Sequence, residues 1–370
     1  MRRDTASELK FLTLILTSDC NLACDYCYQT RGAAYMDANV AVQAIDSFLE
    51  NSRPRARIDF YGGEPLMAFP LMQRVMEYSS EKASSMDKKV SYGFTTNGML
   101  LGRDVFDVLS RFEGHLGVSL DGSPEIHTLG RGPHSWPNVR LIQEFGRRNK
   151  QWSMWINAVV TPSNVGHVSQ SVRFLHALNL GRIHLSYQYE GNWRDEHYRT
   201  LARQFDELAE WGMDVYSRRR EGLIDALKRT IPGKQPFACT AGQDRFAVMP
   251  DGSIYGCFPL APLSRRAAES GTELCLGTVD DLRKPWQEGL GREVRHFRQT
   301  DYHAASQDCC TCRDLLLCAV CPGVGLSAHG DPFTAPESVC RISRIRWRAS
   351  ERVFATLTAR DGSHLWNLVQ

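Results

Sequence analysis

The chain has 370 residues, enough for one large barrel and a second, smaller domain. Its formal net charge of +2 is close to neutral, so neither nucleic acid nor a membrane surface is indicated as a partner. The apolar run 11–16 is too short for a signal-peptide core or a transmembrane helix, which predicts a cytoplasmic protein. Twelve cysteines in such a chain favour metal binding over disulfides.

Segments of strand and helix character alternate from residue 11 to about 220. The expected strands are 11–17, 56–61, 90–95, 115–120, 152–161 and 183–189. The expected helices are 37–51, 69–83, 103–112, 135–149, 164–178 and 194–219. This alternation predicts βαβ units with a parallel sheet. Six such units fall short of the eight of a complete barrel.

Alternation within single strands predicts that the interior of this barrel is polar. Leu116, Val118 and Leu120 share one face of their strand, whereas Ser119 and Asp121 share the other. The apolar face is expected under the helices and the polar face in the lumen. A polar lumen suits a bound polar cofactor better than it suits a packed core of branched side chains.

The first strand leads into Cys20, Cys24 and Cys27, which are spaced C-x3-C-x2-C. Thiolates are the usual ligands of iron–sulfur clusters, and three of them leave one iron of a 4Fe–4S cluster without a protein ligand. An open iron is a place where a small molecule can coordinate. The alternative is three ordinary buried cysteines, which the polar neighbours Ser18 and Asp19 disfavour.

Four further motifs follow strands or strand ends. They are Tyr61-Gly62-Gly63-Glu64-Pro65, Thr95-Thr96-Asn97-Gly98, Ser119-Leu120-Asp121-Gly122 and His127-Thr128-Leu129-Gly130-Arg131-Gly132. Each motif taken alone is an ordinary turn signal, but the carboxyl ends of parallel strands meet at one rim, where ligand sites form. In this order and with the cysteine loop, the motifs resemble the signature of the radical S-adenosylmethionine (SAM) superfamily. Thr128 departs from the Asp that the family more often has.

The resemblance implies that SAM binds beside the cluster of the cysteine loop. Glu64 would pair with the methionine ammonium, Arg131 would bind the carboxylate through charge-assisted hydrogen bonds, and Tyr26 would cover the adenine. The other implied SAM contacts are the backbone of Gly62 and Gly63 and, for the ribose hydroxyls, Asn97, Ser119 and Asp121.

The last third of the chain carries nine of the twelve cysteines, after a bridge at 221–238 that is marked by Pro232-Gly233. Their spacing is C-x12-G-x4-C, then C-x2-C-x5-C-x2-C, then one more cysteine. This pattern resembles the SPASM domain of radical SAM peptide-modifying enzymes, which holds two auxiliary 4Fe–4S clusters. A zinc module is the alternative, because paired C-x2-C motifs also bind zinc.

Two separate ligand sets are implied for these auxiliary clusters. The first cluster would take Cys239, Cys257 and Cys321, with Cys275 preferred to Cys310 as its fourth ligand unless that iron stays open to the substrate. The ligands implied for the second cluster are Cys309, Cys312, Cys318 and Cys340.

The expected fold class is therefore α/β, a partial (β/α)6 barrel with a small cysteine-rich α+β C-terminal domain that holds iron–sulfur clusters. The expected division is a barrel at 1–220, the bridge at 221–238, a SPASM domain at 239–345, and a C-terminal helix and tail at 346–370. The expected cofactors are SAM and three 4Fe–4S clusters, one that binds SAM and two auxiliary ones.

The resemblance also implies the reaction. The reduced cluster would cleave SAM to a 5′-deoxyadenosyl radical, which takes hydrogen from a side chain of a ribosomally made peptide to form a carbon–carbon, ether or thioether cross-link. Sulfatase maturation to formylglycine is the alternative, although those maturases typically carry Asp where Phe258 stands. A non-catalytic iron–sulfur scaffold or electron carrier is the alternative of another class, and it leaves Glu64 and Arg131 without a purpose.

The expected partners are a precursor peptide and an external reductant such as flavodoxin or ferredoxin. A separate leader-binding protein is a further candidate, because no peptide-recognition domain stands before the first strand. The sequence does not identify a catalytic base. Candidates for substrate contact lie near the ends of later strands: Asn157, Gln188, Tyr189 and Glu190.

Overall fold

The computed structural model describes residues 9–219, 227, 239–263, 274–280, 309, 311–312 and 321–361. Two of the implied cluster ligands, Cys310 and Cys318, lie outside the described residues, as does the predicted bridge apart from residue 227. In the part of the chain that is described, no helix is both long and apolar enough to cross a membrane.

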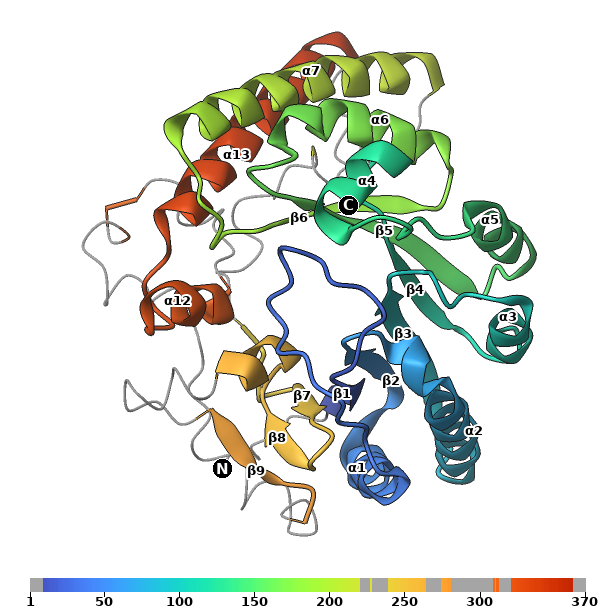
Figure 1. Ribbon diagram of the computed structural model, residues 1–370. Coiled ribbons are helices and arrows are strands. Elements are labelled where there is room, and N and C mark those ends of the chain that lie inside the picture. The colour runs from blue at the N-terminus through green and yellow to red at the C-terminus, as the bar shows by residue number, and fades with distance from the viewer. Residues whose placement is uncertain are drawn as a thin grey trace.

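One continuous sheet organises the described chain, with strands in the order β6-β5-β4-β3-β2-β1-β7-β8-β9 (Figure 1). Strands β1 to β6 pair in parallel and in sequence order, and β7 pairs in parallel with the other edge of β1. Strands β8 and β9 continue the sheet antiparallel. The strand bounds are β1 Leu9–Thr17, β2 Ser52–Gly62, β3 Lys89–Thr96, β4 Gly114–Ser119, β5 Trp152–Val160, β6 Arg182–Tyr187, β7 Arg245–Val248, β8 Ser253–Tyr255 and β9 Cys275–Thr278.

Helices connect the parallel strands and cover the outer side of the curved sheet (Figure 1). Their bounds are α1 Ala38–Asn51, α2 Phe69–Ser85, α3 Arg103–Leu109, α4 Pro124–Arg131, α5 Val139–Arg148, α6 Val168–Ala177, α7 Asp195–Arg219, α12 Pro322–His329 and α13 Glu337–Asp361. Short 3-10 turns lie at η1 Pro65–Ala68, η2 Val165–His167 and η4 Phe258–Leu263.

Local sequence signals explain where several of these helices begin. The Asp37 carboxylate accepts a hydrogen bond from the backbone N–H of Asn39 at the start of α1, and the Asn138 side chain accepts one from Leu141 N–H at the start of α5. Such caps satisfy N–H groups that have no partner within the helix. They confirm that the helical patterns of the sequence start close to the predicted residues.

The two faces of the sheet differ as the alternation predicts. Ile58 and Phe60 are fully buried against the outer helices and belong to the main apolar core. On the opposite face, Arg57 and Asp59 form an ion pair of 2.6 Å inside the barrel. Each fully buried large apolar side chain contributes roughly 1.5–3 kcal/mol to folding. The apolar core between the sheet and the outer helices therefore provides the hydrophobic stabilisation, and the lumen can contain polar groups.

The C-terminal helix α13 packs along α7 on the barrel (Figure 1). The Arg341 guanidinium lies 3.8 Å from the centre of the Tyr198 ring and 2.7 Å from Asp195, both on α7. Together with the β1–β7 pairing, this contact ties the C-terminal region to the barrel at two places.

All six predicted strands and all six predicted helices of the barrel are confirmed, with ends that shift by a few residues. The predicted start of β2 was late, because Arg53 and Pro54 do not look like strand residues, yet the strand begins at Ser52. The helix α4 was not predicted as a helix, since its residues were interpreted only as a ligand motif. The predicted domain boundaries remain a prediction.

Candidate active site

The cysteine loop leaves β1 at Thr17 and is held in place at its base by backbone hydrogen bonds. Gly63 N–H donates to the carbonyl of Thr17 and Glu64 N–H donates to that of Asp19, both at 2.9 Å. A Cβ on Gly63 would lie 2.1 Å from the Asp19 carbonyl oxygen, so glycine is required for this approach. The Gly62-Gly63 pair therefore fixes the start of the cysteine loop against the end of β2.

The three cysteines of the loop are free thiols. Burial is the largest influence on Cys20 and Cys24 and raises the pKa of both thiols. The nearby Arg131 guanidinium opposes this at Cys24 and lowers its pKa, which favours the thiolate that binds metal. Cys27 acts electrostatically on both other sulfurs, so the three lie near one another, as ligands of one cluster must.

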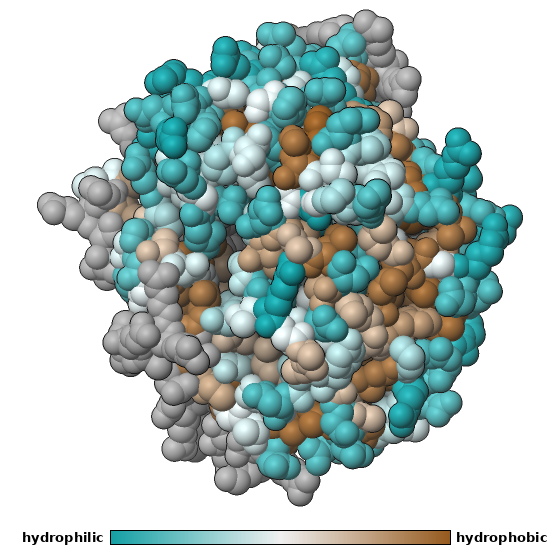
Figure 2. All heavy atoms as spheres, viewed as in Figure 1, coloured by the Kyte–Doolittle hydropathy of each residue, from teal (hydrophilic) through white to brown (hydrophobic). Residues whose placement is uncertain are grey.

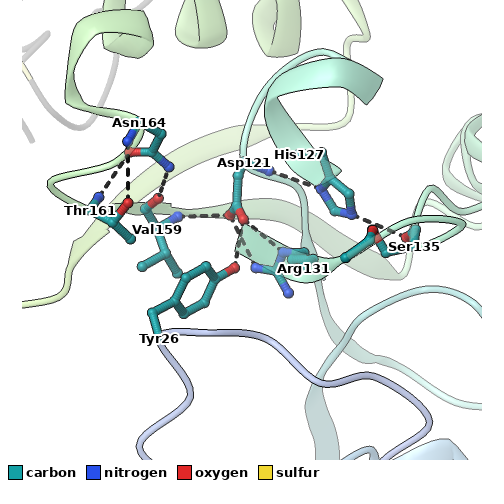
Figure 3. A network of polar contacts seen from close by, with 9 residues as sticks. Tyr26, Asp121, His127, Arg131, Ser135, Val159, Thr161 and Asn164 are labelled. Carbon is teal, nitrogen blue, oxygen red and sulfur yellow. Dashed lines mark hydrogen bonds and ion pairs between the residues drawn. The ribbon is translucent and has the colours of Figure 1, made fainter. Parts of the chain in front are cut away.

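A buried carboxylate, Asp121, joins three elements at the centre of the site (Figure 3). Its Oδ2 accepts hydrogen bonds from the Tyr26 hydroxyl at 2.6 Å and from Arg131 Nε at 2.8 Å. Its Oδ1 accepts from Arg131 Nη2 at 3.1 Å and from Val159 N–H at 2.9 Å. Asp121 thus connects the cysteine loop, helix α4 and strand β5.

The guanidinium of Arg131 has N–H donors that make no hydrogen bond to the described residues. The side chain is only 6% exposed, and its ion pair with Asp121 raises its pKa despite burial. Two of the five N–H groups of an arginine bind Asp121, and the other three have no partner among the described residues. A buried cation with unused donors near Cys24 suits a carboxylate ligand, which is the part that the sequence predicted for Arg131.

Helix α4 is fixed beneath this pair by His127, which is fully buried. Its Nδ1 accepts from Asp121 N–H at 3.3 Å, so its Nε2 donates to the Ser135 carbonyl at 3.1 Å (Figure 3). Burial, with help from the charge of Arg131, lowers the pKa of His127 to about 4. A neutral ring in this single tautomer satisfies both backbone groups.

Glu64 is buried as well, and the protein itself uses its carboxylate. Oε1 accepts from Thr96 Oγ1 at 2.7 Å and from Leu66 N–H at 3.1 Å, while Oε2 accepts from Asn97 N–H at 2.8 Å. Burial raises its pKa to about 6 although these donors oppose the rise. Glu64 therefore connects the end of β2 to the end of β3, beside the site where the methionine ammonium is predicted.

The predicted SAM contacts lie at one rim of the barrel. Asn97 donates from its side chain to Asn21 of the cysteine loop at 2.7 Å, and Ser119 is buried at the end of β4. The ring of Tyr26 packs against Gly130, where a Cβ would be 2.7 Å from a ring carbon. Protein donors lie on both oxygens of Asp121, and its contact with the ribose remains a prediction.

The three cysteines predicted for the first auxiliary cluster influence one another. Burial raises the pKa of Cys257 to about 12, and Cys321 and Cys239 add to the rise. The Cys275 sulfur lies 3.5 Å from the Gly277 carbonyl. Among the described residues, no three His, Cys, Asp or Glu side chains lie close enough together to bind a single metal ion. A 4Fe–4S cluster does not require such an arrangement, because each of its thiolate ligands binds a different iron.

An aromatic group that the sequence did not reveal lies between the two cysteine sites. The Tyr61 ring is 4.0 Å from that of Phe258, next to Cys257. The hydroxyl of Tyr61 is 3.0 Å from the hydroxyl of Tyr28, next to Cys27. Only the positions of the two tyrosines beside the motifs could have signalled this contact.

The predicted substrate residues make local contacts within the protein. Asn157 accepts from Ser186 Oγ at 2.7 Å inside the barrel. The Gln188 carbonyl accepts from Trp193 Nε1 and the Tyr189 carbonyl accepts from Ser338 Oγ of α13, so their backbones serve local structure. Glu190 is exposed and acts electrostatically on Cys321. Their contact with a substrate remains a prediction.

Exposed apolar side chains surround the mouth of this rim. In the described ranges, the large hydrophobic residues with substantial exposure are Tyr28, Tyr35, Leu100 and Leu129. All four follow the carboxyl end of a barrel strand, and Figure 2 shows apolar surface toward the middle of the face that Figure 1 views. The rim combines a polar, buried centre with an apolar margin.

Comparison with known proteins identifies the class of this site. Residues 14–175 match the model of the radical SAM superfamily. The match contains the cysteine loop and the motifs that provide Glu64, Asp121 and Arg131. Residues 14–175 thus resemble a radical SAM domain, as the sequence predicts.

Relatives extend the likeness along the chain. An uncharacterised protein of Methanocaldococcus jannaschii is 26% identical over 295 residues, which cover 78% of this chain and 96% of the relative. A cysteine-type anaerobic sulfatase-maturating enzyme of Clostridium perfringens strain 13 is 25% identical over 279 residues, covering 67% and 74%. The radical SAM cyclopropyl synthase TigE of Paramaledivibacter caminithermalis is 20% identical over 373 residues, covering 93% and 74%.

A solved structure confirms the architecture. The structure of His-tagged anSMEcpe with bound AdoMet superposes with a TM-score of 0.73 at 19% identity, covering 98% of each chain. At this identity the likeness concerns the fold, and it confirms the predicted partial barrel with a further C-terminal region.

Proposed function

We propose that this protein is a radical SAM peptide maturase that takes a hydrogen atom from a side chain of a ribosomally made peptide and forms a cross-link. One observation carries the proposal: three free thiols lie beside a buried arginine, Arg131, that retains unused donors. A non-catalytic electron carrier needs the thiols but has no use for the arginine.

The residues of the rim have distinct parts in this proposal. When bound, a reduced 4Fe–4S cluster and SAM supply a 5′-deoxyadenosyl radical. Cys20, Cys24 and Cys27 would hold the cluster. Arg131 would bind the SAM carboxylate while Asp121 fixes its guanidinium. The implied ribose contacts are those of Asn97, Ser119 and Asp121, and Tyr26 would cover the adenine.

The C-terminal cysteines would hold two auxiliary clusters near the same rim. Cys239, Cys257 and Cys321 would serve the first, because their sulfurs influence one another. Cys275 would be its fourth ligand, as the sequence prefers. The second would use Cys309, Cys312 and Cys340 with Cys318. An external reductant and a separate leader-binding protein complete the proposal.

The environment of Phe258 favours cross-linking over sulfatase maturation. The side chain has no titratable group and packs on Tyr61 at 4.0 Å, where the maturases typically have an Asp. The name of the relative TigE records a cyclopropyl synthase, which is a precedent for carbon–carbon bond formation among the relatives. Sulfatase maturation is the second candidate because other relatives carry that name.

The proposal is tested with the full chain after anaerobic reconstitution, given SAM and a chemical reductant. Formation of 5′-deoxyadenosine is expected, and Arg131→Gln should weaken the affinity for SAM by at least tenfold, since a charge-assisted bond contributes about 1.5–3 kcal/mol. The matched control is Arg74→Gln, on the outer surface of α2. Absence of 5′-deoxyadenosine from the parent protein would refute the proposal.

The two enzyme candidates differ in their products. A candidate precursor peptide that loses two hydrogen atoms, measured by mass spectrometry, supports the cross-link. A sulfatase peptide whose active-site cysteine loses its sulfur and becomes an aldehyde supports maturation instead. The same protein preparation should be given both peptides.

A further inference from the structure

The opposite end of the barrel contains a second polar space. A cavity of about 450 Å³ lies at the amino ends of the middle strands, far along those strands from the cysteine loop. Its lining side chains come from β2 to β5 and the residues just before β4 and β5: Arg55, Lys89, Ser91, Glu113, His115, Lys150, Gln151 and Ser153. This volume is within the range of about 300–1,000 Å³ that is usual for small-molecule sites.

The strand register explains why these side chains share one space. Arg55 pairs with Lys89 across β2 and β3, and His115 pairs with Ser153 across β4 and β5. Ser91 is two residues beyond Lys89 and so points to the same face. That face is the lumen, because the alternate residues Ala56 and Tyr92 are buried on the helical side.

The charges of this cavity are unbalanced. Its lining contains three permanent cations, Arg55, Lys89 and Lys150, and one acid, Glu113. Arg55 and Lys89 have no ion-pair partner among the described residues, and the Lys150 ammonium donates only to the Gly146 carbonyl there. Cations directly opposite each other on paired strands destabilise a sheet, so the Arg55–Lys89 pair does not stabilise the fold.

Deeper in the lumen, the positive charge is paired with a negative one. Arg57 is paired with Asp59 at 2.6 Å. Burial lowers the pKa of His115, and the charge of Arg57 lowers it further, so this ring is neutral at pH 7 and offers an N–H donor. A ligand that entered from the amino end would meet the unpaired cations first and neutral donors behind them.

We propose that this cavity binds the phosphoryl group of a small molecule. Arg55 and Lys89 would neutralise its charge, and the hydroxyls of Ser91 and Ser153 would donate to its oxygens. The Gln151 amide already donates to the Ser110 carbonyl at 3.0 Å. The two cations face this space from β2 and β3, and the two hydroxyls face it from β3 and β5. A phosphoryl group presents three oxygens or more and close to two negative charges, so it matches two cations better than a carboxylate with two oxygens and one charge. The site is separate from the SAM site and does not depend on the cysteines.

Calorimetric titration of the full chain with inorganic pyrophosphate at low ionic strength tests the site. Saturable one-to-one binding is expected, and Arg55→Gln with Lys89→Gln should weaken it at least tenfold, because each lost charged donor contributes about 1.5–3 kcal/mol. Lys89→Arg should retain binding. The control Arg74→Gln should not change it, and circular dichroism checks that each variant is folded.

Three results would overturn the proposal. They are no saturable heat with the parent protein, an equal loss in the Arg74 control, and binding of the dicarboxylate succinate as tight as that of pyrophosphate. Inorganic phosphate serves as a second probe, and weaker but still Arg55-dependent binding of it supports the site. None of these outcomes bears on SAM cleavage, so the two proposals succeed or fail separately.

Discussion

The two ends of the barrel differ in how their charged side chains are arranged: they are buried and paired at the carboxyl rim and, among the described residues, exposed and unpaired at the amino end. At the carboxyl rim, Asp121 accepts four hydrogen bonds, and Arg131 lies against it in a buried ion pair. At the amino end, Arg55 and Lys89 lie side by side and retain contact with water. A buried charge needs a partner, while an exposed charge can rely on solvent.

This difference indicates where removal of a charge harms the protein and where it does not. At the rim the charges hold elements together, because Asp121 joins the cysteine loop to α4 and β5. At the amino end the charges oppose each other, and they contribute nothing to the cohesion of the sheet. Four substitutions test this contrast.

Cys24→Ala should have the largest effect, because it removes one of three thiolates from the rim. Formation of 5′-deoxyadenosine is expected to fall to background, while visible absorbance from the C-terminal clusters persists. The control is Asp25→Ala, an exposed neighbour in the same loop. Parental rates of 5′-deoxyadenosine formation in Cys24→Ala would contradict the assignment of the loop.

Asp121→Asn should destabilise the fold by about 4 kcal/mol, the usual loss when one partner of a buried ion pair is removed. The cause is the Arg131 guanidinium, which remains buried without its counter-charge. Urea unfolding measures the free energy, and equilibrium binding should show weaker affinity for SAM. Exposed Asp107→Asn is the control. A change below 1 kcal/mol would mean that Asp121 does not hold the rim together.

His127 should make stability depend on pH. Its pKa is about 4 in the folded protein, below its ordinary value near 6.5. Its contribution is therefore fully present above pH 6.5 and is lost as the pH falls toward 4, by about 3 kcal/mol in total. His127→Asn should remove this part of the slope in urea unfolding between pH 7 and pH 4. An unchanged slope would contradict a neutral, buried ring.

Lys89→Gln should have the smallest effect and the opposite sign. Relief of its repulsion with Arg55 is expected to stabilise the sheet by roughly 0.5 kcal/mol. Urea unfolding in low and high salt measures this, and the gain should shrink in high salt because salt screens exposed charges. A destabilised variant would show that Lys89 has a stabilising partner after all.

Much of the fold could be predicted from the sequence, because the outer face of each strand is apolar at every second residue. Leu116, Val118 and Leu120 show this pattern, and all three are fully buried. The length of β2 could not be predicted, since Arg53 and Pro54 are poor strand residues and tertiary pairing overrides local preference. The sequence does not predict helix α4, because its residues are interpreted only as a ligand motif.

The sequence predicts which residues belong to the site better than it predicts how these residues contact one another. The order of motifs gave Glu64, Asp121 and Arg131, and parallel strands bring them to one rim. Sequence could not show that Arg131 returns to Asp121 from the end of α4, ten residues later. It also could not show that Glu64 accepts from Thr96 and Asn97, since such contacts depend on the exact position of each strand end.

The pairing of β7 with β1 has a consequence for biosynthesis. Leu14 lies beside Val248, 234 residues further along the chain. At a translation rate of about 5–20 residues per second, the outer edge of the first strand waits roughly 10–50 s for its neighbour. An open strand edge of this kind invites association with other nascent chains. Chaperone supply and growth temperature should therefore govern the yield of this protein in a heterologous host.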